Sequence, residues 1–154
     1  MITSWRITRR EYAETSFDGK GAAFAGGRWN SRENAVVYTS SSAALATLEL
    51  LVNIDDPAPF SGYVLFACSF HEKIVERLDR SALPSDWRRY PAPVALKQLG
   101  DAWLAGRRSA VFEVPSAVIE TESNFLLNPD HADFVKIDIR DLVPFSLDIR
   151  LLRR

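Results

Sequence analysis

Residues 35–53 read AVVYTSSSAALATLELLVN, and this stretch decides the expected fold. Its first six residues are rich in β-branched and aromatic types, which predicts a strand over 35–40. Ser41 or Ser42 can then cap a helix that runs to about Asn53. The helix is apolar on nearly all sides, so we expect it to be buried.

Elements of both kinds are expected on either side of this stretch. Residues 2–7 are expected to form a short edge strand, and residues 62–70, apolar on both faces, a central strand. More strands than helices, in mixed order, predict an α+β fold: a single compact domain over 1–154, with a mixed, mostly antiparallel sheet and a few helices. The remaining expectations are a long ordered loop at 14–34, a strand or bend at 72–79, a helix from Pro93 to Ala105 that stops at Gly106, and strands at 110–114, 134–139 and 146–152.

Composition excludes several classes of protein. The chain has 154 residues, 47% of them hydrophobic and 25% charged, which is typical of an ordinary globular protein. The net charge of -1 provides no overall basic excess that would attract nucleic acid. The single cysteine, Cys68, excludes an internal disulfide and is expected to be a buried, inert thiol. Neither a signal peptide nor a run of about 18 apolar residues is present, so the cytoplasm is the expected location.

One carboxylate, Glu49, lies beside the apolar side of the helix expected after Ser42. At about 100° per residue, Glu49 falls next to Leu45 and one turn below Val52. Thr47 can satisfy its hydroxyl on the helix backbone, but a buried carboxylate without partners costs several kcal/mol or changes its pKa. Two interpretations stay open: Glu49 pairs with a cation in the core, or it lines a pocket.

A glycine pair precedes Arg28 in the segment GGRWN, residues 26–30. Two glycines permit backbone conformations closed to other residues, or the close approach of a ligand. An arginine on such a loop, followed by an aromatic ring and an amide, is suited to hold phosphate or ribose. The alternative is a tight turn with a surface Arg28 and a Trp29 that packs.

Two hydroxyl side chains are further candidates. Tyr38, in the middle of the strand expected over 35–40, is either a core residue or a pocket wall that stacks on a planar ring. Ser116 follows a strand and a proline but lacks the G-x-S-x-G setting of a nucleophile. With only His71 and His131 in the chain, a Ser-His-Asp triad is poorly supported, and no pair of residues has metal-ligand spacing.

The spacing of these motifs resembles the RES domain family, from about Trp5 to Leu152. The family name records an Arg, a Glu and a Ser, and Arg28, Glu49 and Ser116 stand at those positions. The stretches that carry the resemblance are GRWN at 27–30, VYTS at 37–40, ALATLE at 44–49, VPSAV at 114–118, NFLLNP-x-H at 124–131 and the closing F-x-x-D-x-RL at 145–151.

The resemblance implies a bacterial toxin whose fold is similar to that of ADP-ribosyltransferases. Such toxins deplete NAD by cleaving the nicotinamide–ribose bond, through hydrolysis or through transfer to inorganic phosphate as co-substrate. NAD is then a substrate, and no permanently bound cofactor is expected. The implied partner is an Xre-like helix-turn-helix antitoxin that binds DNA and covers the toxin's active site. Direct contact of the toxin with nucleic acid or membrane is not expected, whereas a homodimer within the complex is.

The same resemblance gives each candidate residue a role. Cleavage of the N-glycosidic bond builds positive charge on the ribose, which a fixed carboxylate stabilises. Glu49 is expected to be that carboxylate, and Arg28 to hold the diphosphate or the attacking oxyanion. Tyr38 is expected to stack on nicotinamide or to shape its slot, and Ser116 to hydrogen-bond the substrate or Glu49. The remaining residues expected to contact NAD are Trp29, Asn124 and Asn128.

Three alternatives stay open at this point. The first is a mono-ADP-ribosyltransferase that attaches the ribose to a macromolecule. The second is a non-enzymatic binding module in which Arg28 and Glu49 form a structural ion pair. The third is a serine hydrolase that uses Ser116 as its nucleophile.

Overall fold

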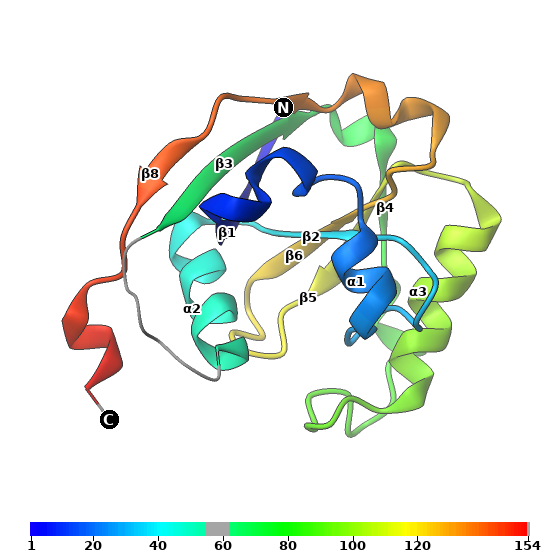
Figure 1. The fold of residues 1–154 in the computed structure, drawn as a ribbon. Helices are drawn as coiled ribbons and strands as arrows, with labels where there is room; N and C mark the ends of the chain where they lie inside the picture. The colour runs from blue at the N-terminus through cyan, green and yellow to red at the C-terminus, as the bar shows by residue number, and fades with distance from the viewer. Residues whose placement is uncertain (55–61, 154) are drawn as a thin grey trace.

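A computed structural model describes residues 1–54 and 62–153 as one curled sheet with helices packed against it (Figure 1). The strands are β1 (Ile2–Arg9), β2 (Val37–Ser40), β3 (Tyr63–Phe70), β4 (Val75–Arg77), β5 (Val111–Pro115), β6 (Ser123–Leu127), β7 (Asp138–Ile139) and β8 (Val143–Phe145). The α-helices are α1 (Lys20–Ala25), α2 (Ala43–Asn53) and α3 (Val94–Gly106). Short 3-10 helices are η1 (Arg10–Thr15), η2 (Glu72–Ile74), η3 (Arg80–Ala82), η4 (Ala132–Lys136) and η5 (Ile149–Leu152).

The strand order is β4-β5-β6-β2-β1-β3-β7, and β8 also pairs with β3. Strands β4 and β5 run parallel, while the other pairings are antiparallel. The expected α+β class with a mixed, mostly antiparallel sheet is therefore confirmed.

The sheet divides into two halves between β1 and β2. Strands β1 and β3 pair along their whole length, from Ile2–Phe70 to Arg9–Tyr63, whereas β1 and β2 share the single residue pair Trp5–Ser40. Figure 1 shows the consequence: β1, β3 and β8 lie on one side, and β2, β6, β5 and β4 on the other. Where the two strands separate, their facing edges are no longer hydrogen-bonded to each other.

Helix α2 follows β2 directly and begins where the sequence predicts. The Oγ of Ser42 accepts a hydrogen bond from the Leu45 backbone N–H at 3.0 Å, which makes Ser42 the N-cap. Thr47 donates its hydroxyl to the Ala43 carbonyl, as expected. The expectation of a buried helix holds for one face only, because α2 packs on β1 and β2 but leaves Val52 59% exposed.

The core is formed by clusters on the faces of the sheet. Helix α3 buries Leu96 and Trp103 against the half of the sheet that contains β5 and β6, where Trp103 stacks on Phe112 with ring centroids 5.2 Å apart. Cys68 is fully buried in β3, and burial raises the pKa of its thiol to about 12, which confirms a buried cysteine.

Several local expectations need correction in the first two thirds of the chain. Residues 2–7 are not an edge strand, because β1 pairs with β2 on one side and with β3 on the other. The region 14–34 is not entirely loop, since it contains α1. Helix α3 continues through Gly106, and Arg107 takes the left-handed conformation, at φ 49°, that ends it.

The C-terminal strands also differ from expectation. Strand β6 was not predicted, the first half of 134–139 belongs to η4 while Asp138–Ile139 form strand β7, and η5 replaces most of the strand expected at 146–152. The side chains of His131 and Asp148 accept from the backbone N–H two residues later and so begin these 3-10 helices. Such local bonds compete with strand pairing, which a hydrophobic pattern does not reveal.

Candidate active site

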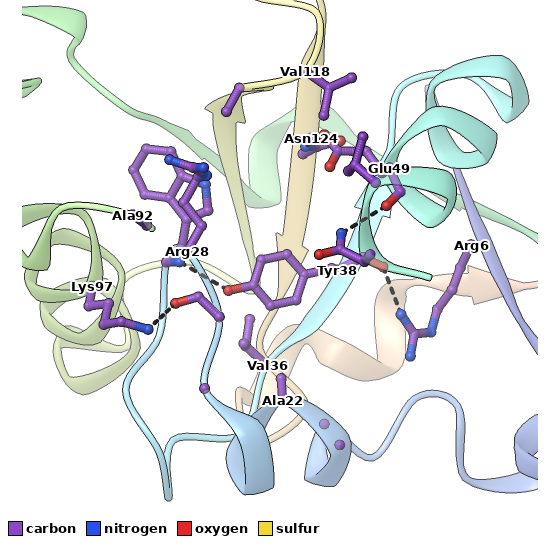
Figure 2. A pocket seen from close by; sticks show the side chains of 18 of the residues that line it. Arg6, Ala22, Arg28, Val36, Tyr38, Glu49, Ala92, Lys97, Val118 and Asn124 are labelled. Atoms are coloured by element: carbon purple, nitrogen blue, oxygen red, sulfur yellow. Dashed lines mark hydrogen bonds between the residues drawn. The ribbon is translucent and has the colours of Figure 1, made fainter. Parts of the chain in front are cut away.

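A cavity of about 910 Å³ opens where β1 and β2 separate, in the size range typical of small-molecule sites (Figure 2). Its walls come from both halves of the sheet, from α2 and from the loops that precede β2 and α3. The charged and hydrogen-bonding side chains in these walls include Arg6, Arg28, Tyr38, Glu49, Lys97 and Asn124.

Helix α2 directs Glu49 into this cavity, one turn from Val52, which also lines it. The Oε1 atom of Glu49 accepts hydrogen bonds from Ser116 Oγ at 2.8 Å and from Asn124 Nδ2 at 2.6 Å. Within the described part of the chain, none of the ion pairs involves Glu49. Of the two interpretations left open for this carboxylate, the pocket position is the one that the structure shows.

Ser116 uses its whole hydroxyl in holding Glu49. Ser116 is fully buried, and its Oγ accepts hydrogen bonds from the backbone N–H groups of Val118 and Ile119 at 3.1 and 3.0 Å. The hydroxyl in turn donates a hydrogen bond to Oε1 of Glu49. A nucleophilic serine needs a base beside it and an exposed oxygen. The geometry instead fits the expectation that Ser116 hydrogen-bonds Glu49.

Asn124 is held in turn by Ser40. The two residues are partners in the β2–β6 ladder, and Ser40 Oγ donates to Asn124 Oδ1 at 2.8 Å. Both bonds to the Glu49 carboxylate therefore fall on Oε1. No donor among residues 1–54 and 62–153 reaches Oε2, and no buried side-chain oxygen there lacks a partner. Oε2 is therefore open to the cavity.

Arg28 forms the opposite wall, and Figure 2 shows it across the cavity from Glu49 with the Tyr38 ring between them. Its Nη1 donates to the carbonyls of Trp87 and Arg89 at 2.9 and 3.0 Å. Burial lowers the pKa of Arg28, and the charge of Glu49 partly offsets this effect. Arginine stays charged despite such shifts, so Arg28 places a positive charge on the side of the cavity opposite Glu49.

The Arg28 loop rests on one face of α3. Lys97 donates its ammonium to the Gly27 and Asn30 carbonyls, and Asp101 accepts from the backbone N–H and hydroxyl of Ser31. Between them, Gly100 lies so close to the loop that a Cβ would stand 1.7 Å from the Trp29 carbonyl oxygen. These three positions, Lys97, Gly100 and Asp101, are spaced to share a face of the helix and are called the α3 platform below.

Tyr38 connects the loop to β2. Its hydroxyl donates to Asn30 Oδ1 at 2.7 Å and accepts from the Trp29 N–H at 3.1 Å. Burial raises the pKa of Tyr38 well above its usual value, so the phenol is neutral at physiological pH. Gly27 is required here, because a Cβ would lie 2.6 Å from the Tyr38 oxygen. Because the hydroxyl is hydrogen-bonded to the loop, the part of Tyr38 that is available to a ligand in the cavity is its aromatic ring.

Two of the residues expected to contact NAD, Trp29 and Asn128, do not place their side chains in the cavity in the expected way. Trp29 lines the cavity, but it is only 2% exposed and packs with Leu96 and Trp103. Its side chain therefore belongs to the hydrophobic core. Asn128 is 3% exposed, is absent from the cavity wall, and its Oδ1 accepts from the Asp130 N–H in a turn. The structure therefore does not bring Asn128 to the site.

Three cavity cations, Arg6, Arg88 and Lys97, were not singled out from the sequence. The guanidinium of Arg6 spans the gap in the sheet, because it donates to the Ser16 and Tyr38 carbonyls at 2.9 and 3.0 Å. No local pattern distinguishes Arg6 in its strand. For Lys97 a signal did exist, since an isolated glycine inside a helix, Gly100, indicates close packing on that face.

The described ranges contain no group of three His, Cys, Asp or Glu side chains placed to hold a metal ion. Within the same ranges, no helix has the length and apolarity that crossing a membrane requires.

Comparison with known proteins identifies a family and relatives that cover most of the chain. The family model "RES domain" matches residues 3–148. A protein named Toxin Res from Yersinia enterocolitica is 38% identical over 130 residues, which cover 84% of this chain and 86% of that protein. Toxin Res from Photorhabdus laumondii is 34% identical over 150 residues, 97% of this chain and 96% of that protein. A protein named Prs ADP-ribosylating toxin, from Sphingobium sp., is 34% identical over 161 residues, 100% of this chain and 99% of that protein.

Among solved structures, a chain of the MbcT-MbcA toxin–antitoxin complex of M. tuberculosis superposes with a TM-score of 0.75. The superposition covers 94% of this chain and 84% of that chain at 17% sequence identity. A likeness at this identity concerns the fold, and it agrees with the α+β architecture described above.

Proposed function

Because this chain belongs to the RES domain family, we propose that it is the toxin of a toxin–antitoxin pair and that it depletes NAD by cleaving the nicotinamide–ribose bond. The observation that carries the proposal is how the two carboxylate oxygens of Glu49 are held. One oxygen of this carboxylate is fixed by two donors, and the other faces a cavity large enough for a dinucleotide's reactive end. Such a fixed carboxylate suits a reaction whose transition state is a cation.

In the proposed reaction, the C–N bond between ribose and nicotinamide breaks, and its electron pair leaves with neutral nicotinamide. The ribose carbon becomes cation-like, and Oε2 of Glu49 stabilises the charge. A bond then forms between that carbon and the oxygen of water or inorganic phosphate. With water, the proton lost by the attacking oxygen passes to Oε2, and the product is ADP-ribose. With phosphate, the product is ADP-ribose carrying the phosphate on the ribose carbon that held nicotinamide.

The other wall of the cavity suits the rest of the substrate. The Nη1 group of Arg28 donates hydrogen bonds to two carbonyls, and no acceptor in the described ranges binds its Nε or Nη2. That free edge matches the geometry of a phosphate, so we assign it to the NAD diphosphate or to the phosphate acceptor. Tyr38 presents a neutral ring between the walls, where the planar nicotinamide can stack. Asn124 takes part in the proposed reaction by holding the Glu49 carboxylate with its hydrogen bond.

The proposed partner is an antitoxin that covers this cavity. Relatives of this chain are named toxins, and the MbcT-MbcA structure is a toxin–antitoxin complex. We propose an antitoxin with an Xre-like DNA-binding domain, a cytoplasmic site of action, and pairing of the toxin within the complex. Co-expression of the proposed antitoxin should suppress NAD loss, and copurification of the two chains would support the pairing.

A transferase that modifies a macromolecule is the second candidate. One relative, similar over the full chain, is named an ADP-ribosylating toxin. The same carboxylate and cavity would serve that reaction, with a protein side chain in place of water or phosphate. The two candidates differ in where the ADP-ribose goes and not in how the first bond breaks.

The test is to incubate the purified chain with NAD in buffer with and without inorganic phosphate, and separately with cell lysate and labelled NAD. Loss of NAD with release of nicotinamide and free ADP-ribose, or its phosphate, supports degradation. Label on protein favours transfer. A folded chain that consumes no NAD under either condition contradicts both candidates and favours a binding module.

A further inference from the structure

We infer that Ser40 is a positioning residue for the proposed reaction: it fixes the Asn124 amide so that its NH₂ group holds Glu49. This inference rests on the proposed function. Ser40 does not line the main cavity and was given no role from the sequence. It acts only through a second side chain.

The contacts form one continuous chain. Ser40 Oγ donates to Asn124 Oδ1 at 2.8 Å, and Asn124 Nδ2 donates to Glu49 Oε1 at 2.6 Å. Ser40 is 4% exposed, so water competes little for its hydroxyl. Ser40 and Asn124 are directly paired in the β2–β6 ladder, which fixes the distance between their side chains.

The chemistry of the amide explains why a donor is needed on the far side. An asparagine side chain has an acceptor end and a donor end of nearly the same shape. If Asn124 turned its oxygen toward Glu49, two acceptors would face each other in a partly buried site, which is unfavourable. When the NH₂ group faces the carboxylate, the oxygen end faces Ser40, and the Ser40 hydroxyl donates to it. The carboxylate, which only accepts, therefore takes the NH₂ end of Asn124, and the Ser40 hydroxyl holds the amide in that orientation.

Ser116 cannot replace this function. Its own orientation is set by the backbone N–H groups of Val118 and Ile119, and it donates to the same oxygen, Oε1. One donor leaves a carboxylate free to rotate about that contact, whereas two donors from different directions hold its plane. The position of Oε2 in the cavity thus depends on both Ser116 and Asn124.

The expected effect of Ser40→Ala is a loss of catalysis with substrate binding retained. Misplacement of a catalytic group by a fraction of an ångström to 1 Å costs on the order of 10- to 100-fold in rate. We expect kcat for NAD cleavage to fall by about that factor while KM changes by less than about twofold, since Arg28 and Tyr38 keep their contacts. Ser40→Thr keeps the hydroxyl and should restore most of kcat.

A matched control and a double-mutant cycle separate positioning from general damage. Ser109 is also buried, at 8% exposure, and hydrogen-bonds Trp103 and Val111 away from the cavity, so Ser109→Ala should change the melting temperature but not kcat. In an Asn124→Ala background, Ser40→Ala should have no further effect on kcat. An unchanged kcat in Ser40→Ala, or an equal loss in both backgrounds, overturns the inference.

A measurement without turnover keeps the inference testable if the proposed function fails. The side-chain NH₂ signals of Asn124 in the ¹H–¹⁵N NMR spectrum, assigned by their loss in Asn124→Ala, report its bond to Glu49. They should shift in Ser40→Ala and in Glu49→Gln and stay in place in Ser109→Ala. A wild-type chain that does not cleave NAD contradicts the proposed function, whereas unmoved Asn124 signals in Ser40→Ala contradict the positioning role itself.

Discussion

Glu49 and Arg28 face each other across one cavity, but side chains hold the first and backbone carbonyls hold the second. Glu49 receives its two hydrogen bonds from Ser116 and Asn124, on the β5 and β6 side of the sheet. Arg28 donates to two main-chain carbonyls, and its loop is supported by the α3 platform. We call the Glu49 side of the cavity the acidic wall and the Arg28 side the basic wall. Single side-chain substitutions can therefore remove individual hydrogen bonds in the acidic wall, whereas the position of Arg28 in the basic wall changes only when the backbone around it moves.

This difference predicts two kinds of mutant. Substitutions on the acidic wall should change the reaction rate with little effect on folding, because each removes a hydrogen bond and little packing. Substitutions in the α3 platform should first change stability, because its Gly100 is buried and the same helix buries Leu96 and Trp103. Four variants test this contrast, from the largest expected effect to the smallest.

Glu49→Gln should have the largest effect. The amide keeps the shape of the side chain but removes the negative charge, and removal of a charge-stabilising group of this type costs ~10²–10³ in rate. We expect NAD consumption to fall by at least that factor, with an unchanged melting temperature within about 2 °C. A folded Glu49→Gln protein with normal NAD turnover would falsify the assigned role of the acidic wall.

Arg28→Ala should weaken NAD binding. The variant removes the free guanidinium edge that we assign to phosphate, and a charge-assisted hydrogen bond of this kind contributes about 1.5–3 kcal/mol. Calorimetric titration of NAD into Arg28→Ala should show a Kd raised by about 10- to 100-fold. Affinity equal to that of the wild type would move Arg28 out of the substrate site.

Gly100→Ala should destabilise the basic wall. The added Cβ would stand 1.7 Å from the Trp29 carbonyl oxygen, so the loop or α3 must move. Overpacking of this kind typically costs ~1–3 kcal/mol, which thermal unfolding can measure. Gly21→Ala is the matched control, because nothing lies within 4 Å of its added Cβ. Equal stability of the two variants would show that the loop is not seated on α3.

Asp101→Asn should have the smallest effect, and one that depends on pH. Burial opposes ionisation of Asp101, but hydrogen bonds from Ser31 and Asn34 outweigh it and hold the pKa of Asp101 below its ordinary value. A lowered pKa adds stability above the unfolded-state pKa of about 3.9, and that stability is lost as the pH falls through the folded-state value. The difference in melting temperature between wild type and Asp101→Asn should be largest near neutral pH and shrink below about pH 4. A difference that is constant with pH would mean that the charge of Asp101 contributes nothing.

The local parts of the acidic wall were predictable from sequence. The N-cap at Ser42 and the start of α2 follow from short-range rules, and the conflict between a carboxylate and an apolar helix indicated Glu49. The placement of Ser116 and Asn124 beside it was expected through family resemblance rather than pattern. Ser40 was not anticipated, because its role depends on the register between β2 and β6, and β6 itself was not predicted.

The basic wall was less predictable. The glycine pair before Arg28 indicated a specialised loop, but nothing in that segment identifies the carbonyls of Trp87 and Arg89 as its partners, some 60 residues away. The expectation for Asn128 failed for a related reason, since a turn with its own side-chain bond keeps that residue out of the cavity.

The sequence by itself determined which groups are chemically unusual: a carboxylate on an apolar helix, an arginine after two glycines, and a serine at a strand end. These signals are local, because they arise from conflicts between a residue and its immediate neighbours. Only the tertiary structure decided that β1 and β2 separate after one residue pair, that the gap becomes a cavity, and which oxygen of Glu49 stays free. Those outcomes depend on pairings between distant segments, whose geometry is set by the packing of the whole sheet.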